Sequence, residues 1–255
     1  MARISVEDVT LYFPIIGAGD RSVKNTLLSF ATGGKITRNS GTMLVTGLDK
    51  INLQLKDGDR LGLIGHNGAG KSTLLKVLAG IYSPTLGNLE VEGRIVSTLN
   101  ITLGFEHEAT GYENIYLRGR LLGLTMREIE ARIDEIAEFT ELGKYLDLPV
   151  RVYSSGMLMR LAFAVMTSLE SEILLMDEVI GTGDARFIHK AEARLDEFMN
   201  RAKIMVIASH SDEVIKDFCN QALLLKNGSI FAQGEVDEIL DLYESDEYQN
   251  QSELT

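Results

Sequence analysis

Three short runs of aliphatic residues predict buried strands. They cover Arg60–Ile64, residues 172–176 and residues 203–208, and each has a length typical of a strand that is covered on both faces of a parallel sheet. The first residues of the chain, MARISVEDVTLYF, contain acids and alternate between polar and apolar positions. This pattern predicts a further strand, in an antiparallel part of the fold, rather than a signal peptide.

The segments between these runs show the periodicity of helices. Thr125 is followed three residues later by Glu128, which is the form of a capping box. Beyond it, apolar positions recur every three or four residues, at Ile129, Ile133, Ile136 and Phe139. A second helix, expected to be buried on several sides, runs from about residue 155 to residue 166. Strands that alternate with helices predict an α/β fold with a parallel sheet.

The predicted organisation is one domain of residues 1–245 with two insertions. Residues 99–156 lack long β-runs and predict a helical lobe inserted between two core strands. Residues 17–47 are rich in Gly, Ser, Thr and Asn and hold four basic residues against one acid, which predicts a surface loop with a short amphipathic helix at residues 23–30. We expect this loop either to be solvated and mobile or to face a membrane.

The charge, the cysteine content and the hydropathy of the chain exclude some partners and some cellular compartments. With 25 basic and 37 acidic residues the formal net charge is −12, which argues against a protein that binds nucleic acid by neutralising phosphates. Eight of the acids lie in residues 235–255, so residues 246–255 are predicted to be a solvated acidic tail. Cys219 is the one cysteine, and no apolar stretch approaches the length of about 18 residues that spans a bilayer. We therefore expect a reducing, cytosolic location or the cytosolic face of a membrane.

Residues 65–72 fit the phosphate-binding pattern G-x-x-x-x-G-K-[ST] between a predicted strand and a predicted helix that ends near Gly80. Glycines let the backbone curl so that successive N–H groups surround a phosphate. Lys71 is predicted to reach the β- and γ-phosphates of a nucleotide, and Ser72 to ligate Mg²⁺. The candidate nucleotide-binding residues of this segment are Gly65, His66, Asn67, Gly68, Ala69, Gly70, Lys71, Ser72 and Thr73.

Two acids end the second predicted core strand. Asp177 is a candidate for holding the hydration shell of Mg²⁺, and Glu178 is a candidate catalytic base that polarises an attacking water. A strand that ends in two acids is a weak signal alone. Together with the phosphate-binding loop it predicts hydrolysis of a nucleoside triphosphate.

The segment YSSGMLMRLAFA, residues 153–164, begins with a small-residue turn and continues as a predicted helix. With the phosphate-binding loop upstream, it closely resembles the signature motif of the ATP-binding cassette (ABC) ATPases. The resemblance covers about residues 3–245 and implies the ABC ATPase fold. It also implies that Ser154, Ser155 and Gly156 bind the γ-phosphate of an ATP held by the opposite subunit, a role suited to the N–H groups of a helix start.

Other positions match the family in order. Asp184 stands six residues after Glu178, as the family's D-loop aspartate does, and His210 matches the switch histidine that contacts the γ-phosphate. Tyr12 resembles the aromatic residue that stacks on adenine, with packing in the core as its alternative. The family's usual Gln is missing, because no Gln occurs between Gln54 and Gln221, and Glu106 is the candidate metal contact in its place, with His107 as the neighbouring option.

The chain resembles the polysaccharide-export branch of this family most closely, through four phrases. These are SSGM with RLAFAV, GDA with Phe187, TGYENI at residues 110–115, and the insert before the phosphate-binding loop. Some members of this branch append a carbohydrate-binding domain, which we do not expect in a chain that ends at Thr255.

The resemblance implies an ATP- and Mg²⁺-dependent ATPase subunit of an exporter of lipid-linked O-antigen-type polysaccharide. Two copies would form a homodimer that drives a separate membrane permease, also in two copies, from the cytoplasmic face of the inner membrane. Two alternatives stay open from the residues: a cassette ATPase of translation or DNA repair without a membrane partner, and a P-loop kinase acting on a small molecule.

Overall fold

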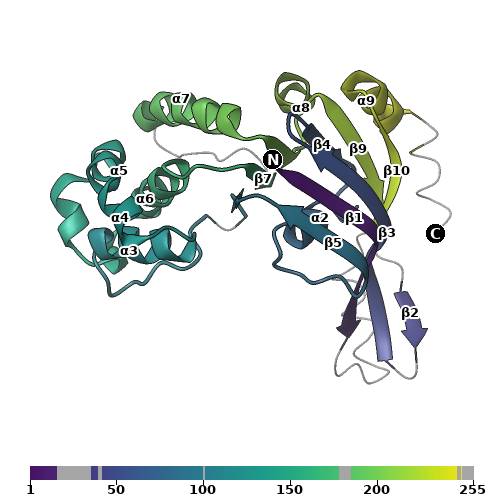
Figure 1. The fold of residues 1–255 in the computed structure, drawn as a ribbon, viewed down its shortest axis with the longest axis horizontal. Coiled ribbons are helices and arrows are strands. Elements are labelled where there is room, and N and C mark those ends of the chain that lie inside the picture. Colours follow the sequence, from purple (N-terminus) through teal and green to yellow (C-terminus); the bar gives the residue numbers. More distant parts are fainter. Residues whose placement is uncertain (16–35, 40–41, 100, 178–184, 246–247, 249–255) are drawn as a thin grey trace. The chain divides into compact units, whose positions relative to one another are not determined.

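The computed structural model describes residues 1–15, 36–39, 42–99, 101–177, 185–245 and 248 (Figure 1). The chain divides into two compact units, which are described one at a time. Unit 1 comprises Met1–Gly93, Ile173–Val179 and Lys203–Thr255, and unit 2 comprises Arg94–Glu172 and Ile180–Ala202. Unit 2 is therefore larger than the lobe predicted at residues 99–156.

Unit 1 contains a mainly parallel sheet. Its strands run in the order β10 (Ser229–Gly234), β9 (Gln221–Lys226), β4 (Arg60–Ile64), β8 (Ile204–Ala208) and β7 (Ile173–Asp177). Strand β4 pairs in parallel with β8 and β9, and β7 pairs in parallel with β8, while β10 and β9 are antiparallel. All residues of β8 are buried, as expected for a strand in the middle of a covered sheet. The three strands predicted from apolar runs are thus confirmed, with small shifts at their ends.

A second, antiparallel sheet of unit 1 has the order β2 (Ile36–Asn39), β3 (Thr42–Lys56), β1 (Arg3–Ile15) and β5 (Leu86–Glu92). The predicted N-terminal strand and its antiparallel setting are confirmed. The prediction of a loop over residues 17–47 is wrong for residues 36–39 and 42–47, because there the backbone finds partners in the pairing of β2 with β3 and of β3 with β1. Residues 16–35, with the predicted amphipathic helix, lie outside the described residues.

Three helices of unit 1 follow these strands: α2 (Lys71–Leu78), α8 (Asp212–Phe218) and α9 (Val236–Glu244). The end of α2 at Leu78 confirms the predicted helix end near Gly80. Helix α9 buries Val236, Ile239 and Leu240, and Tyr248 beyond it is 1% exposed. The prediction of a solvated acidic tail is therefore wrong for Tyr248, because removing an aromatic ring from water lowers the free energy of the folded state.

Unit 2 is mainly helical. It contains β6 (Ile95–Ser97), α3 (Gly111–Leu121), α4 (Met126–Glu130), α5 (Ile133–Thr140), two 3₁₀ turns at Gly143–Asp147 and Val150–Val152, α6 (Ser155–Thr167) and α7 (Ala185–Arg201). The Thr125 capping box is confirmed, with the Thr125 hydroxyl accepting a hydrogen bond from the Glu128 N–H at 3.3 Å. The helix predicted to follow it is two helices, because the chain bends at Arg132 before α5. Helix α6 matches its prediction, and its residues from Leu161 to Thr167 are all buried.

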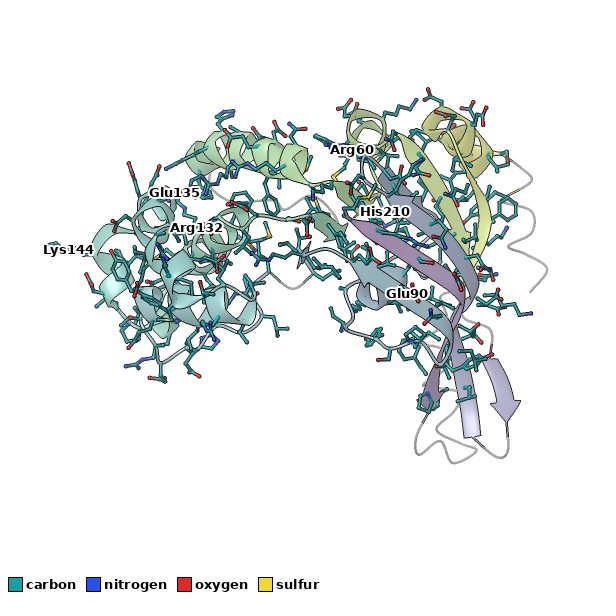
Figure 2. The ribbon with its side chains drawn as sticks, in the orientation of Figure 1. Arg60, Glu90, Arg132, Glu135, Lys144 and His210 are labelled. Carbon is teal, nitrogen blue, oxygen red and sulfur yellow. The ribbon has the colours of Figure 1, made fainter. Side chains whose placement is uncertain are left out.

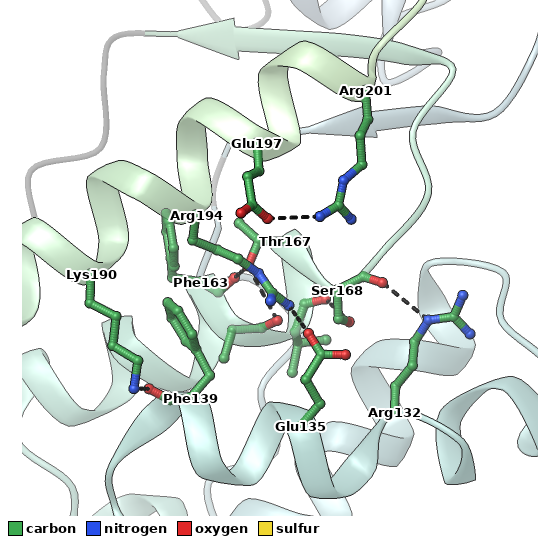
Figure 3. A network of polar contacts seen from close by, with 12 residues as sticks. Arg132, Glu135, Phe139, Phe163, Thr167, Ser168, Lys190, Arg194, Glu197 and Arg201 are labelled. Atoms are coloured by element: carbon green, nitrogen blue, oxygen red, sulfur yellow. Dashed lines mark hydrogen bonds and ion pairs between the residues drawn. The ribbon is translucent and has the colours of Figure 1, made fainter.

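Aromatic rings and ion pairs join α5, α6 and α7 within unit 2. Phe139 of α5 stacks on Phe163 of α6 with 6.0 Å between ring centroids. Arg194 of α7 forms an ion pair with Glu135 at 2.5 Å and donates to the Thr167 hydroxyl at 3.3 Å (Figure 3). These contacts make α7 a part of the helical unit, which its position in the sequence after Asp177 did not indicate. Within the described ranges, no helix is both long enough and apolar enough to cross a membrane.

Candidate nucleotide-binding site

The P-loop, defined here as residues 65–72, connects the end of β4 to the start of α2 in unit 1. Gly65, Gly68 and Gly70 have φ angles of 144°, 80° and 113°, in the region that favours glycine. A Cβ atom on Gly65 would lie 2.5 Å from the carbonyl oxygen of Leu225 in β9. The loop can therefore pass this close to β9 only because residue 65 has no side chain.

Lys71 is held inside the curl of the P-loop. Its side chain is 8% exposed, and its ammonium donates hydrogen bonds to the carbonyl oxygens of Gly65 at 2.5 Å and His66 at 3.2 Å. An ammonium with three donors on a flexible stem binds phosphate as a point charge. The loop thus carries its cation at the N-terminus of α2, where the helix dipole also favours an anion.

A cavity of about 640 Å³ opens over the P-loop, entirely within unit 1. Six of the predicted nucleotide-binding residues line it: Asn67, Gly68, Gly70, Lys71, Ser72 and Thr73. Asp177 at the end of β7 and His210 after β8 line the same cavity. The side chain of His210 is exposed (Figure 2). The volume lies within the range of small-molecule sites, about 300–1,000 Å³.

The other three predicted residues of the loop form its back. The Ala69 carbonyl accepts a hydrogen bond from the Gly228 N–H at 2.9 Å, and the Ala69 N–H donates to the His66 carbonyl at 3.1 Å. Gly65 and His66 make the contacts to Lys71 described above. These residues therefore shape the loop from behind and are not among the lining residues of the cavity.

The apolar end of the cavity is formed by β1 and β3. Phe13 lines it together with Val45 and Gly47, and its ring meets the ring of Tyr82 edge-on at 5.4 Å. Tyr12, the predicted adenine-stacking residue, is not a lining residue of this cavity. Neighbouring residues of a strand point to opposite faces of the sheet, so Phe13 faces the cavity and Tyr12 does not.

Ser72 and Asp177 supply the oxygen atoms that Mg²⁺ prefers. Both line the cavity, one at the first turn of α2 and the other at the end of β7. Mg²⁺ keeps several waters and is usually held by one or two side chains together with substrate phosphates, so these two donors fit it. The part of the chain that the structure describes holds no cluster of three or more His, Cys, Asp or Glu side chains for a metal. When bound, Mg²⁺ neutralises charge that develops on the phosphates.

Two predicted site residues cannot be placed in this geometry. Glu178, the candidate base, and Asp184, the candidate D-loop aspartate, lie outside the described residues. Asp177 is the last described residue before them, and it ends β7 at the cavity.

The signature segment lies in unit 2 at the start of α6. Ser154 is the N-cap residue, and its hydroxyl accepts a hydrogen bond from the Met157 N–H at 3.2 Å. Ser155 and Gly156 form the first turn, and all three small residues are exposed. Apart from its chain neighbours and the backbone of α6, the described residues place one atom within 4 Å of a Cβ atom on Gly156, the Ser154 hydroxyl at 3.9 Å. The contacts described within this chain therefore do not require a glycine at position 156.

Tyr153 joins this turn to the 3₁₀ turn at Gly143–Asp147 and lies close to the start of α3. Its hydroxyl donates to the Tyr145 carbonyl at 2.7 Å, and it would lie 2.3 Å from a Cβ atom on Gly111 at the start of α3. Burial, with the nearby charge of Asp147, raises the pKa of Tyr153 to about 12. The phenol therefore stays protonated and keeps its hydrogen bond near neutral pH.

Glu106, the candidate in place of the missing Gln, lies in unit 2 and is exposed. The buried amide of Asn114 holds its backbone from both sides, accepting from the Glu106 N–H at 2.8 Å and donating to the Glu106 carbonyl at 2.9 Å. Arg118, one turn further along α3, donates to the carbonyls of Leu103 and Ile101. Burial lowers the pKa of the Arg118 guanidinium. The sequence analysis missed Arg118, although its spacing of four residues from Asn114 places both on one helix face.

Comparison with known proteins decides the family. The sequence profile of the ABC transporter family matches residues 48–181. The chain is 46% identical over 234 residues to the O-antigen export system ATP-binding protein RfbE of Yersinia enterocolitica, covering 91% of this chain and 98% of the relative. This chain belongs to the ABC transporter family. As the resemblance predicted, it is an ATP-binding subunit of the family and an ATPase.

Other ABC transporter relatives are longer. The chain is 42% identical over 216 residues to the O-antigen export system ATP-binding protein RfbB of Myxococcus xanthus, covering 85% of this chain and 49% of that protein. It is 35% identical over 242 residues to the teichoic acids export ATP-binding protein TagH of Lactococcus lactis, covering 95% of this chain and 50% of that protein. The chain thus spans about half the length of these two relatives.

Solved structures share the ABC ATPase fold. The ATP-binding subunit of an ABC transporter superposes with a TM-score of 0.67 at 21% identity, with 98% of each chain covered. A bacterial ABC transporter cassette solved as a dimer superposes with a TM-score of 0.65 at 19% identity, covering 91% of this chain and 98% of that one. The predicted fold class, an α/β P-loop core with a helical lobe and an N-terminal antiparallel part, is confirmed.

Proposed function

We propose that this chain is the ATP-hydrolysing subunit of an ABC transporter that exports a lipid-linked O-antigen-type polysaccharide across the inner membrane. One observation carries the proposal: the 46% identity to an O-antigen export ATP-binding protein extends over nearly the whole of both chains. Relatives named for O-antigen and for teichoic acids both match, and both names refer to cell-surface polymers. The substrates named for these relatives therefore have in common that they are polymers destined for the cell surface.

The cavity supports ATP as the energy source. Lys71 and the P-loop N–H groups would bind the phosphates, while Ser72 and Asp177 would hold Mg²⁺ with its waters. His210 lines the cavity where it would contact the γ-phosphate. Phe13 and Val45 provide the apolar wall against which a base would pack. Glu178, next in the chain after Asp177, would polarise the attacking water.

Two copies of the chain would make a complete site in this proposal. The signature turn is exposed, with open space around Gly156, which supports its use by a partner. The P-loop of this chain would bind the opposite side of the same phosphate. A related cassette has been solved as a dimer. Each of two ATP molecules would lie between the P-loop of one subunit and the Ser155 turn of the other, with Asp184 near the contact.

A separate permease would complete the exporter. The homodimer would bind two copies of this membrane subunit at the cytoplasmic face of the inner membrane, and closure of the dimer on ATP would drive the permease. No nucleic acid is involved in this proposal.

The test is a strain in which the gene for this chain is deleted. We expect surface polymer to disappear and lipid-linked polymer to accumulate inside the cell, and the wild-type chain to restore export. Lys71→Ala should fail to restore it, because the cation on the phosphates is lost. Lys56→Ala is the matched control, because Lys56 is an exposed lysine of β3 outside the cavity. Normal surface polymer in the deletion strain would refute the proposed substrate class.

A further inference from the structure

The ring of Tyr248 is buried in unit 1 although the residues around it in the sequence are polar. It is 1% exposed and meets three other aromatic rings. The centroid distances are 5.2 Å to Tyr243, 5.4 Å to Phe231 and 6.3 Å to His66. Burial of a large aromatic ring fastens the chain at this point. The ring reaches the P-loop from behind, since His66 is the second residue of that loop.

The hydroxyl of Tyr248 contacts both the P-loop and the strand that supports it. It donates a hydrogen bond to the Leu225 carbonyl of β9 at 3.0 Å, and the His66 N–H points to it at 3.4 Å. Leu225 is also the residue whose carbonyl excludes a side chain at Gly65. One phenol therefore bridges the two backbones at the place where the loop passes closest to β9.

The peptide group between Gly65 and His66 is held at both ends. Its carbonyl accepts the hydrogen bond from the Lys71 ammonium at 2.5 Å, and its N–H faces the Tyr248 hydroxyl. In a trans peptide the C=O and N–H bonds point in opposite directions within one rigid plane. A contact that fixes the N–H therefore also fixes the direction of the carbonyl that holds Lys71.

Lys226 secures Tyr248 in this position. Its ammonium donates to the backbone carbonyl of Tyr248 and lies 4.4 Å from the centre of the Tyr248 ring, an arrangement suited to a cation–π interaction. The Lys226 side chain is 8% exposed. A buried ammonium requires such partners, because loss of water around a charge is costly.

We propose that Tyr248 is a positioning residue for ATP binding, which orients the Gly65–His66 peptide and through it the ammonium of Lys71. Tyr248 in this way supports the nucleotide site, although it is not among the lining residues of the cavity. The proposal concerns the ATPase itself and is independent of the polymer that is exported.

Tyr248→Phe tests the proposal, because it keeps the ring in place and removes only the hydroxyl. We expect the Kd for ATP in the presence of Mg²⁺, measured by calorimetry on the full chain, to rise about three- to ten-fold, the effect of losing one or two hydrogen bonds. The thermal unfolding midpoint should stay within about 2 °C of the wild-type value. Hydrogen exchange of the His66 amide should become faster, while exchange in β4 and β8 stays unchanged.

Tyr243→Phe is the matched control, because Tyr243 belongs to the same aromatic cluster, while the hydroxyl that the His66 N–H faces is that of Tyr248. Its Kd for ATP should stay within about two-fold of the wild-type value. Lys226→Met provides a second variant. It should also raise the Kd for ATP, because Tyr248 loses the ammonium that holds it. Wild-type ATP affinity in both Tyr248→Phe and Lys226→Met would overturn the proposal. So would a fall in stability of either variant with an unchanged Kd, since that result would show a purely structural role.

Discussion

At the scale of single residues, Phe13 and Tyr12 are expected to differ in their contribution to ATP binding. They are neighbours in β1, yet only Phe13 lines the cavity. Replacing Phe13 with Ala should weaken ATP binding about ten-fold, because stacking of an aromatic ring on a base contributes about 1–3 kcal/mol. Tyr12→Ala is the matched control and should change the Kd by less than about two-fold. Calorimetric titration with ATP measures the Kd of both variants. A larger rise of the Kd in Tyr12→Ala than in Phe13→Ala would identify Tyr12 as the stacking residue.

Cys219 gives a second prediction at the residue scale. Burial raises the pKa of its thiol from 9.0 to about 12, although the charge of Arg60 acts in the other direction. Because the thiolate is the reactive form, alkylation by iodoacetamide at pH 8 should be about 1,000-fold slower in the folded protein than in urea. Mass spectrometry over time measures both rates. Equal rates in the two conditions would contradict the raised pKa.

At the scale of elements, the loop before α3 depends on one buried amide. The Asn114 side chain holds both backbone groups of Glu106 and also donates to the Thr110 and Ala109 carbonyls at 2.9 Å and 3.2 Å. Thr110 caps the same helix through a capping box with Glu113, whose pKa the hydrogen bonds from Thr110 lower. Hydrogen bonds therefore hold α3 and the loop before it together.

Asn114→Ala should destabilise the protein by about 1–3 kcal/mol, because it removes the acceptor of the Glu106 N–H and leaves the carbonyls of Glu106, Ala109 and Thr110 with their backbone donors alone. Asn200→Ala is the control, since Asn200 is exposed in α7 and alanine is a good helix former. Urea denaturation followed by circular dichroism measures the free energy of unfolding of both variants. A change below about 0.5 kcal/mol in Asn114→Ala would show that water replaces the amide.

At the scale of the whole molecule, the proposed composite site predicts a difference between two mixed dimers. In one, Lys71→Ala lies in one subunit and Ser155→Arg in the other, so both changes fall in the same site and the second site stays intact. In the other, both changes lie in one subunit and damage both sites. We expect about one retained nucleotide per dimer in the first arrangement and almost none in the second, measured after rapid gel filtration. Equal retention would show that each subunit binds ATP alone.

The features predicted correctly from the sequence are those set by residues close together in the chain. The apolar run of β4, the glycine turns of residues 65–70, and the capping box at Thr125 each depend on neighbours within a few positions. Backbone angles, helix caps and strand periodicity are local properties, so a single sequence carries them. The match to the signature segment then indicated the family, which the comparisons confirm.

Tertiary structure alone decided the features that join distant segments. The position of β1 beside the P-loop brings Phe13 to the cavity, Asn114 and Arg118 hold the loop around Glu106, and Tyr248 packs behind the P-loop from 182 residues away. The polar sequence around Tyr248 predicts a solvated tail, yet the energy of burial depends on the rings it meets and not on its neighbours in the chain. Local sequence therefore determined the chemistry of the phosphate site, while long-range packing determined which residues surround and support it.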